Sequence, residues 1–179
     1  GYITSFNQQL PVISENQEIS NTFTYTKYNE LNKSSEMIGK ASLYLKAINT
    51  LDGSDVRVSK RANVPYNRLR GFEKGKVGPV DSTDYIGGNY ISTLNLSTNI
   101  PGLLSTIEIL DFNYFIDFAN VWGVDYNSSL DNSTIRSSTG IGLNVLTPVG
   151  PLSFSLTQPL TKASSDKTET FRFNLGTTF

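Results

Sequence analysis

The sequence contains neither cysteine nor histidine in its 179 residues. The absence of cysteine excludes disulfides, thiolate metal sites and cysteine nucleophiles. The absence of histidine removes the commonest general base, the commonest metal ligand and every Ser-His-Asp triad. Most familiar routes to enzymatic and metal chemistry are therefore closed to this chain.

Charge and long hydrophobic runs are also scarce. The net charge is −1 at pH 7, so there is no broad basic field of the kind that binds nucleic acid. No apolar run approaches the roughly 20 residues of a transmembrane helix, and the start has no signal-peptide pattern. The chain opens on GYITSFNQQL, which reads as a strand within a fold, so we expect it to come from a longer protein. Its length suits one domain.

The residues that are abundant favour β-structure. Ten phenylalanines and nine tyrosines accompany many serines, threonines and asparagines, a mixture that is typical of strands. Eight segments alternate apolar and polar residues with a period of two. They are residues 2–9, 17–28, 40–48, 90–98, 111–122, 138–146, 151–158 and 170–179. The sequence therefore predicts an all-β chain of about eight antiparallel strands.

The polar face of these strands favours a transmembrane barrel over a soluble β domain, which remains the alternative. It carries small polar residues, glycines and isolated charges such as Asp117 and Arg172, and it lacks the lysine and glutamate density of a solvated surface. The apolar face is aromatic near strand ends, at Phe171, Phe179 and Trp122, as in membrane girdles. The short LTPVGPL turn contrasts with the longer polar linkers SSEM, DYNSSLDNST and TKASSDKTE, as turns and loops do at opposite ends of an outer-membrane barrel.

A long insertion, residues 51–88, separates the third strand from the fourth and shows no regular period. It contains LRGF and is basic. Its basic residues are Arg57, Lys60, Arg61, Arg68, Arg70, Lys74 and Lys76. No helix follows that would make a phosphate-binding loop, and no formed surface of interleaved aromatics indicates nucleic-acid binding.

Several motifs in order resemble those of the BamA-type outer-membrane assembly factors, a superfamily of bacterial surface antigen barrels that includes TamA and organellar homologues. LRGF, formed by Leu69, Arg70, Gly71 and Phe72, resembles the family motif (V/I)RG(F/Y). IGGN (86–89), FIDFANVW (115–122) and GIGLNVLTPVGPLSFSLTQPL (140–160) resemble later family motifs. The chain ends on FRFNLGTTF, which resembles the C-terminal assembly signal of outer-membrane proteins, with Phe171, Phe173, Leu175 and Phe179 as its apolar residues.

The resemblance implies the C-terminal half of a sixteen-stranded barrel, integral to a Gram-negative outer membrane, with residues 1–179 as one barrel domain. The implied function is insertion and folding of β-barrel proteins into that membrane. The implied partners are membrane lipid, unfolded β-barrel clients and lipoproteins of the assembly complex. No enzymatic activity, cofactor, metal or nucleic acid is implied. A pore for two-partner secretion and a structural barrel of the OmpA type remain alternatives.

The resemblance also implies residue roles. In the family, the loop folds back into the barrel and its arginine reaches the wall. Asp117 and Phe115 share the polar face of one strand, so Arg70 is expected to pair with Asp117 and stack on Phe115. The alternative is an exposed loop arginine. Asn95 stands among these wall partners where the family usually has an acid, which leaves Asp117 as the main anion. Gly71 is expected to permit a sharp turn, and Phe72 to anchor the loop.

Closure of the sheet is the last expectation, because open strand edges cannot face lipid. We expect an eight-stranded monomer in which the first strand pairs with the last, and a sixteen-stranded dimer of two copies is the alternative. The interior of eight strands just fits side chains, which leaves no room for the long insertion. The family's first strand and its POTRA domains are not in this sequence, so we expect no activity from the chain alone.

Overall fold

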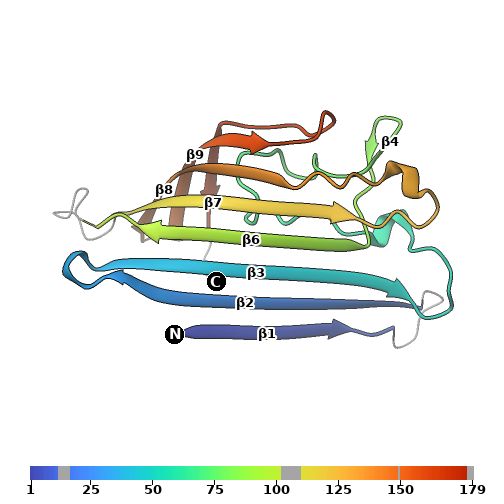
Figure 1. The fold of residues 1–179 in the computed structure, drawn as a ribbon, viewed down its shortest axis with the longest axis horizontal. Coiled ribbons are helices and arrows are strands. Elements are labelled where there is room, and N and C mark those ends of the chain that lie inside the picture. The colour runs from blue at the N-terminus through green and yellow to red at the C-terminus, as the bar shows by residue number, and fades with distance from the viewer. Residues whose placement is uncertain (12–16, 102–109, 149, 177–179) are drawn as a thin grey trace.

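The computed structural model describes residues 1–11, 17–101, 110–148 and 150–176, and its regular secondary structure is almost entirely antiparallel strands (Figure 1). Eight strands form one sheet in the order β1-β2-β3-β6-β7-β8-β9-β10. They are β1 (Tyr2–Gln9), β2 (Glu18–Asn32), β3 (Met37–Thr50), β6 (Tyr90–Asn99), β7 (Leu110–Trp122), β8 (Arg136–Thr147), β9 (Gly150–Thr161) and β10 (Phe171–Leu175). The predicted all-β antiparallel fold is confirmed, and each predicted strand segment corresponds to one of these eight.

Alternation along each strand separates the two faces of the sheet. In β7, Phe115 is 0 % exposed on the inner face, whereas its neighbour Tyr114 is 42 % exposed on the outer face. Large apolar side chains continue along the outer face of the neighbouring strands. They include Leu94, Leu96, Ile141, Leu156, Phe171, Phe173 and Leu175. An exposed apolar outer face is what the lipid-facing side of a membrane barrel requires.

Helices contribute only short turns. The 3₁₀ segments are η1 (Lys33–Ser35), η2 (Val58–Lys60) and η3 (Ser128–Leu130). Within the described ranges, no helix is long and apolar enough to cross a membrane.

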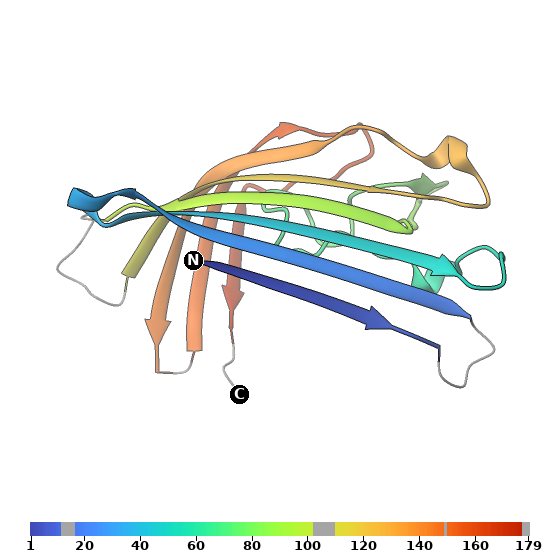
Figure 2. The ribbon, with the colours of Figure 1, turned by 60° about the horizontal axis from the view of Figure 1, so that its bottom comes forward.

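The sheet curves strongly but does not close (Figure 2). β1 and β10 are its two edges, and the described residues of these strands do not pair with each other. The expected eight-stranded closed monomer is therefore wrong. The physical reason lies on the inner face, where the buried residues of the insertion are packed, because a closed ring of eight strands has space only for side chains.

Connections at the two ends of the strands differ. Long segments 51–89, 123–135 and 162–170 lie at one end, called the loop end, whereas the β2–β3 and β8–β9 connections lie at the other, the turn end. The expectation that SSEM belongs with the long linkers is wrong, because β2 runs on to Asn32 and leaves only a tight connection. The Asn32 side chain accepts a hydrogen bond of 3.0 Å from the Ser34 N–H, which closes this turn.

Residues 51–89, called the long loop from here on, lie against the inner face. The loop contains η2 and a small hairpin of β4 (Val80–Asp81) and β5 (Asp84–Tyr85). Its apolar side chains pack against the wall and form a core in the lumen. The core consists of Val56, Ala62, Val64, Leu69, Phe72 and Val77 from the loop and Ile48, Ile91, Ala119 and Val121 from the wall. The serines and asparagines of the inner face suggested that it is uniformly polar, but it is not. Ile48, Ile91 and Val121 fall on this face by strand parity, and this would have indicated its apolar part.

Candidate functional site

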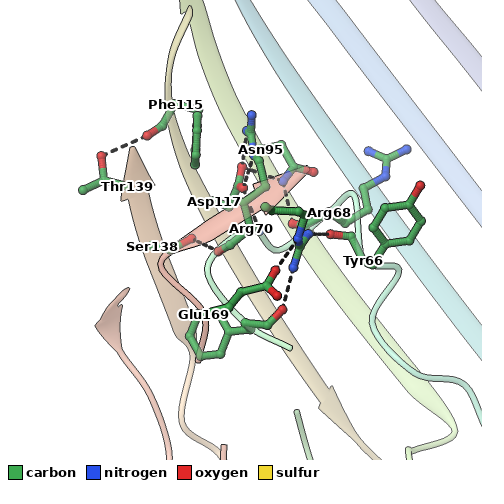
Figure 3. A network of polar contacts seen from close by, with 11 residues as sticks. Tyr66, Arg68, Arg70, Asn95, Phe115, Asp117, Ser138, Thr139 and Glu169 are labelled. Atoms are coloured by element: carbon green, nitrogen blue, oxygen red, sulfur yellow. Dashed lines mark hydrogen bonds and ion pairs between the residues drawn. The ribbon is translucent and has the colours of Figure 1, made fainter. Parts of the chain in front are cut away.

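The LRGF motif lies against the middle of β7, where Arg70 meets Asp117 (Figure 3). The Arg70 Nε and Nη2 atoms donate to the two carboxylate oxygens at 2.7 and 2.8 Å, and the Arg70 backbone N–H donates at 3.1 Å. The Asp117 side chain is 0 % exposed. The structure thus contains the bidentate contact that strand parity permitted, and such fork-to-carboxylate pairs are both directional and strong.

Phe115 forms the floor of this site. The Arg70 guanidinium carbon lies 3.3 Å from the centre of the Phe115 ring, and Phe115 is fully buried. Stacking on the ring holds the guanidinium plane while the carboxylate fixes its direction. Arg70 is therefore a wall contact in this structure and not an exposed loop arginine. The functional role of the contact stays a prediction.

Asn95, on the neighbouring strand β6, completes the shell of donors around Asp117. Its Nδ2 donates to Asp117 Oδ1 at 2.9 Å and to the Arg68 carbonyl oxygen at 2.6 Å. A carboxylate at this position has no such hydrogens to donate. Asn95 therefore joins the loop backbone to the wall, and Asp117 receives four hydrogen bonds. Removing either member of a buried pair strands its partner, which costs more than the pair itself contributes.

Gly71 and Phe72 seat the motif. Gly71 has φ +85°, and a Cβ at this position would lie 2.6 Å from Thr157 Cγ2, so both the backbone angle and the space require glycine. Phe72 is 2 % exposed within the lumen core. On the other side, the Ser138 hydroxyl donates to the Arg70 carbonyl oxygen at 2.5 Å. Contacts from β7 and β8 therefore hold Arg70, and Thr157 of β9 lies close beside Gly71.

A second Arg–Asp pair fastens the loop end of the barrel, and no motif in the sequence points to it. Arg136 Nε lies 2.8 Å from Asp166 Oδ2, and both side chains are 0 % exposed. Arg136 also donates to Asn120 Oδ1 at 2.8 Å and to the Thr134 carbonyl oxygen at 3.0 Å. Asp166 lies in a polar stretch, TKASSDKTE, that is typical of an exposed loop. Only the fold brings it to Arg136.

A third cluster closes the base of the long loop around Asp125. The Val56 N–H donates to Asp125 Oδ2 at 2.6 Å, Asn89 Nδ2 donates to the same oxygen at 3.0 Å, and Arg61 pairs with Oδ1. Burial alone raises the pKa of the Asp125 carboxyl, but these hydrogen bonds and the Arg61 charge outweigh it and hold the pKa below its usual value. The charged form of Asp125 therefore stabilises the fold.

The residues of the C-terminal signal lie on the outer face where the structure describes them. Phe171, Phe173 and Leu175 are each more than half exposed in β10, and Phe154 packs against both phenylalanines. Phe179 lies outside the described residues. The assembly-signal role of all four stays a prediction.

Toward the turn end, the inner face is polar and hollow. A cavity of about 590 Å³ lies below the motif. Its lining includes Arg68, Arg70, Asn95, Asp111, Asn144 and Arg172. This half of the lumen has the polar character that the sequence predicted.

The chain thus has a loop folded into the concave face of a curved antiparallel sheet whose outer face is apolar. Known proteins share this architecture. The family model described as "Omp85 superfamily domain" matches residues 1–179. The chain belongs to the Omp85 superfamily. The match covers the three N-terminal strands as well as the part of the chain that carries the motifs.

Two curated relatives are both described as "Outer membrane protein assembly factor BamA". The protein from Neorickettsia risticii (strain Illinois) is 28 % identical over 142 residues, which cover 77 % of this chain and 19 % of the relative. The protein from Neisseria meningitidis serogroup B is 29 % identical over 140 residues, covering 62 % of this chain and 17 % of the relative. The chain therefore spans about a fifth of the length of these relatives.

A solved structure shares the whole fold. The crystal structure of BamA from Haemophilus ducreyi lacking POTRA domains 1–3 matches 100 % of this chain and 38 % of its own chain, with a TM-score of 0.88 and 26 % sequence identity. The chain is thus a barrel segment of the BamA type, integral to the Gram-negative outer membrane. The open sheet corresponds to part of a larger barrel, which explains why its two edges do not meet.

Proposed function

We propose that this chain is the C-terminal barrel part of an assembly factor that inserts and folds β-barrel proteins into the outer membrane. The single observation that carries the proposal is the inward long loop, whose Arg70 is fixed on Asp117 and Phe115. The BamA names of both curated relatives and of the solved structure support the same function. No step of this function requires bond chemistry, so the factor acts without a cofactor.

The mechanism that fits the fold is templating at a strand edge. Among the strands that the structure describes, β10 pairs with β9 on one side only, so its other side presents backbone donors and acceptors. A client strand can pair with such an edge by β-augmentation. Strands from the rest of the same polypeptide, and not a second copy of this chain, close the barrel against lipid. Unfolded barrel clients and assembly-complex lipoproteins are the partners of the whole protein.

A secretion pore of the same superfamily is the second candidate, because an inward loop is also suited to closing a channel. A structural barrel of the OmpA type is disfavoured, since it has no use for a long loop fixed in its lumen. Depletion of the natural gene distinguishes the first two. Loss of many folded outer-membrane barrels is the expected result. Loss of one secreted protein, with barrels assembled normally, would instead indicate the pore.

The role of the site is tested by Arg70→Ala in the full-length gene, with Arg57→Ala as the control. Arg57 lies in the same loop and is exposed, and its side chain makes no ion pair with the described residues. Arg70→Ala is expected to reduce the amount of folded barrel proteins in the outer membrane, whereas Arg57→Ala leaves it unchanged. Normal assembly in cells that carry Arg70→Ala at wild-type levels would refute the proposed role.

A further inference from the structure

The connector between β9 and β10, residues 162–170, leaves the sheet and runs to the long loop. β9 extends to Thr161, but its pairing with β10 stops at Leu156, which faces Phe171. Beyond that pair, the Thr157 N–H still donates to the Thr170 carbonyl oxygen at 2.8 Å. In an antiparallel strand, the N–H two residues later points to the same side, and here that residue is Pro159, which has none. The β9–β10 hydrogen-bond ladder therefore ends at the point where Pro159 provides no N–H donor.

The connector makes its backbone contacts with the long loop instead. The Glu73 N–H donates to the Lys167 carbonyl at 3.0 Å, and the Lys167 N–H donates to the Lys76 carbonyl at 3.0 Å. The Glu169 N–H donates to the Gly71 carbonyl at 3.1 Å, and Phe72 and Thr168 form an antiparallel bridge. The loop thus replaces a neighbouring strand for the segment that leads directly into β10.

Arg172, the second residue of β10, fixes this arrangement from the strand. Its Nη2 donates to the Phe72 carbonyl oxygen at 2.5 Å, its Nη1 donates to the Tyr66 carbonyl oxygen, and its Nε pairs with Glu169. The side chain is 8 % exposed. One guanidinium therefore contacts two turns of the loop and the connector, and these three directions match the planar fork of arginine.

Asp166 fixes the same arrangement from the connector. Its Oδ1 accepts the Gly78 N–H at 3.2 Å, and its Oδ2 accepts the Ala163 N–H at 2.7 Å and the Arg136 Nε at 2.8 Å. The carboxylate therefore joins the connector to the long loop and to the first residue of β8 while it is fully buried. A buried carboxylate with this many donors has one well-defined position.

We propose that Arg172 and Asp166 are positioning residues through which the long loop sets the start and the rigidity of the last strand. The proposal rests on the proposed function only in naming the free side of β10 as the edge that accepts a client strand. In this arrangement the loop has two tasks, because it is fixed to the wall through Arg70 and it holds the edge strand through Arg172 and Asp166. Loosening of the loop from the connector then loosens the edge.

Amide hydrogen exchange of the full-length protein in lipid vesicles tests the proposal without any client. Arg172→Ala and Asp166→Asn are expected to raise exchange by about tenfold or more at residues 71–76, at 166–170 and in β10, while β7 keeps its protection. Arg172→Lys, which keeps the charge but not the planar fork, is expected to give a smaller rise. Arg57→Ala and Asp84→Asn, at exposed loop positions, serve as matched controls without effect.

Unchanged exchange in β10 of Arg172→Ala and Asp166→Asn would overturn the proposal, as would an equal rise in the controls. If Arg172→Ala does not fold, Arg172→Lys decides the question. Unchanged amide exchange in the connector and in β10 of Arg172→Lys would also overturn the proposal. The result is independent of assembly activity. If the variants show increased exchange but the unmodified protein has no assembly activity, only the proposed function is refuted. If the unmodified protein is active but the variants show normal exchange, only the coupling between the loop and β10 is refuted.

Discussion

Two of the Arg–Asp pairs of this barrel segment, Arg70–Asp117 and Arg136–Asp166, differ in what surrounds them. Arg70 comes from the loop and meets an aspartate of the wall, and its side chain is 22 % exposed beside the polar cavity. Arg136 comes from the wall and meets an aspartate of a loop, and both side chains are fully buried. The first pair therefore has water within reach, and the second has none. The Arg70–Asp117 pair, which belongs to a sequence motif, is therefore the more adaptable of the two, and the Arg136–Asp166 pair, which belongs to none, is the more rigid.

The two pairs are expected to respond differently when their aspartates are removed. Asp166→Ala is expected to lower the free energy of unfolding by about 3–5 kcal/mol, because it leaves Arg136 buried without its anion. Asp117→Ala is expected to have the smaller effect, because the partly exposed Arg70 can turn toward the cavity. Urea unfolding of the full-length protein in detergent micelles measures both. A larger loss for Asp117→Ala would contradict the difference drawn between the pairs.

At Gly71, beside the first pair, the cost of the backbone angle can be separated from the cost of the contact with Thr157. Gly71→Ala is expected to cost about 1–2 kcal/mol for the left-handed backbone angle, with a further cost from the contact with Thr157 Cγ2. Thr157→Ser removes that methyl group, so the double variant is expected to recover about 1 kcal/mol, as a contacting pair does. A double-mutant cycle from urea unfolding gives the value. Strict additivity of the two substitutions would show that the space beside Thr157 is not limiting.

Asp125, whose cluster holds the long loop at its base, is expected to make stability depend on pH. The pKa of its carboxyl is lower in the folded protein than in the unfolded chain, so its stabilisation is full above about pH 4 and is lost as the pH falls through the folded pKa. Asp125→Asn is therefore expected to be less stable at neutral pH and to lose less stability on acidification. Urea unfolding at several pH values measures the slope. The same slope in both proteins would mean that Asp125 does not contribute.

Asn95 is expected to give the smallest effect. Asn95→Ala removes the hydrogen bonds to Asp117 and to the Arg68 carbonyl, and it is expected to cost about 1–1.5 kcal/mol. Asn67→Ala, at an exposed position of the same loop, is the control and is expected to stay within about 0.5 kcal/mol of the parent. Thermal unfolding suffices to rank the two variants. Equal midpoints would show that Arg70 alone holds Asp117.

Strand identity was predictable because period-two alternation depends only on neighbouring residues, as Phe115 and Asp117 on one face of β7 illustrate. The contact between Arg70 and Asp117 was implied by the family resemblance, and strand parity only permitted it. Closure of the sheet was predicted wrongly, although the lack of room for the long loop inside eight strands already argued against it. The sheet corresponds to part of a larger barrel. Asp166 escaped prediction because its surroundings in sequence are those of an exposed loop, and its burial arises from contacts with Arg136 and Gly78 that are distant along the chain.

Amide exchange of the unmodified full-length protein in membrane vesicles tests most directly that the long loop is fixed inside the barrel. The N–H groups of Arg70, Glu73 and Gly78 donate to Asp117, to the Lys167 carbonyl and to Asp166. These amides are therefore predicted to exchange as slowly as the amides in the middle of β7. Exchange at the rate of unprotected amides would contradict the inward, fastened loop on which the account depends.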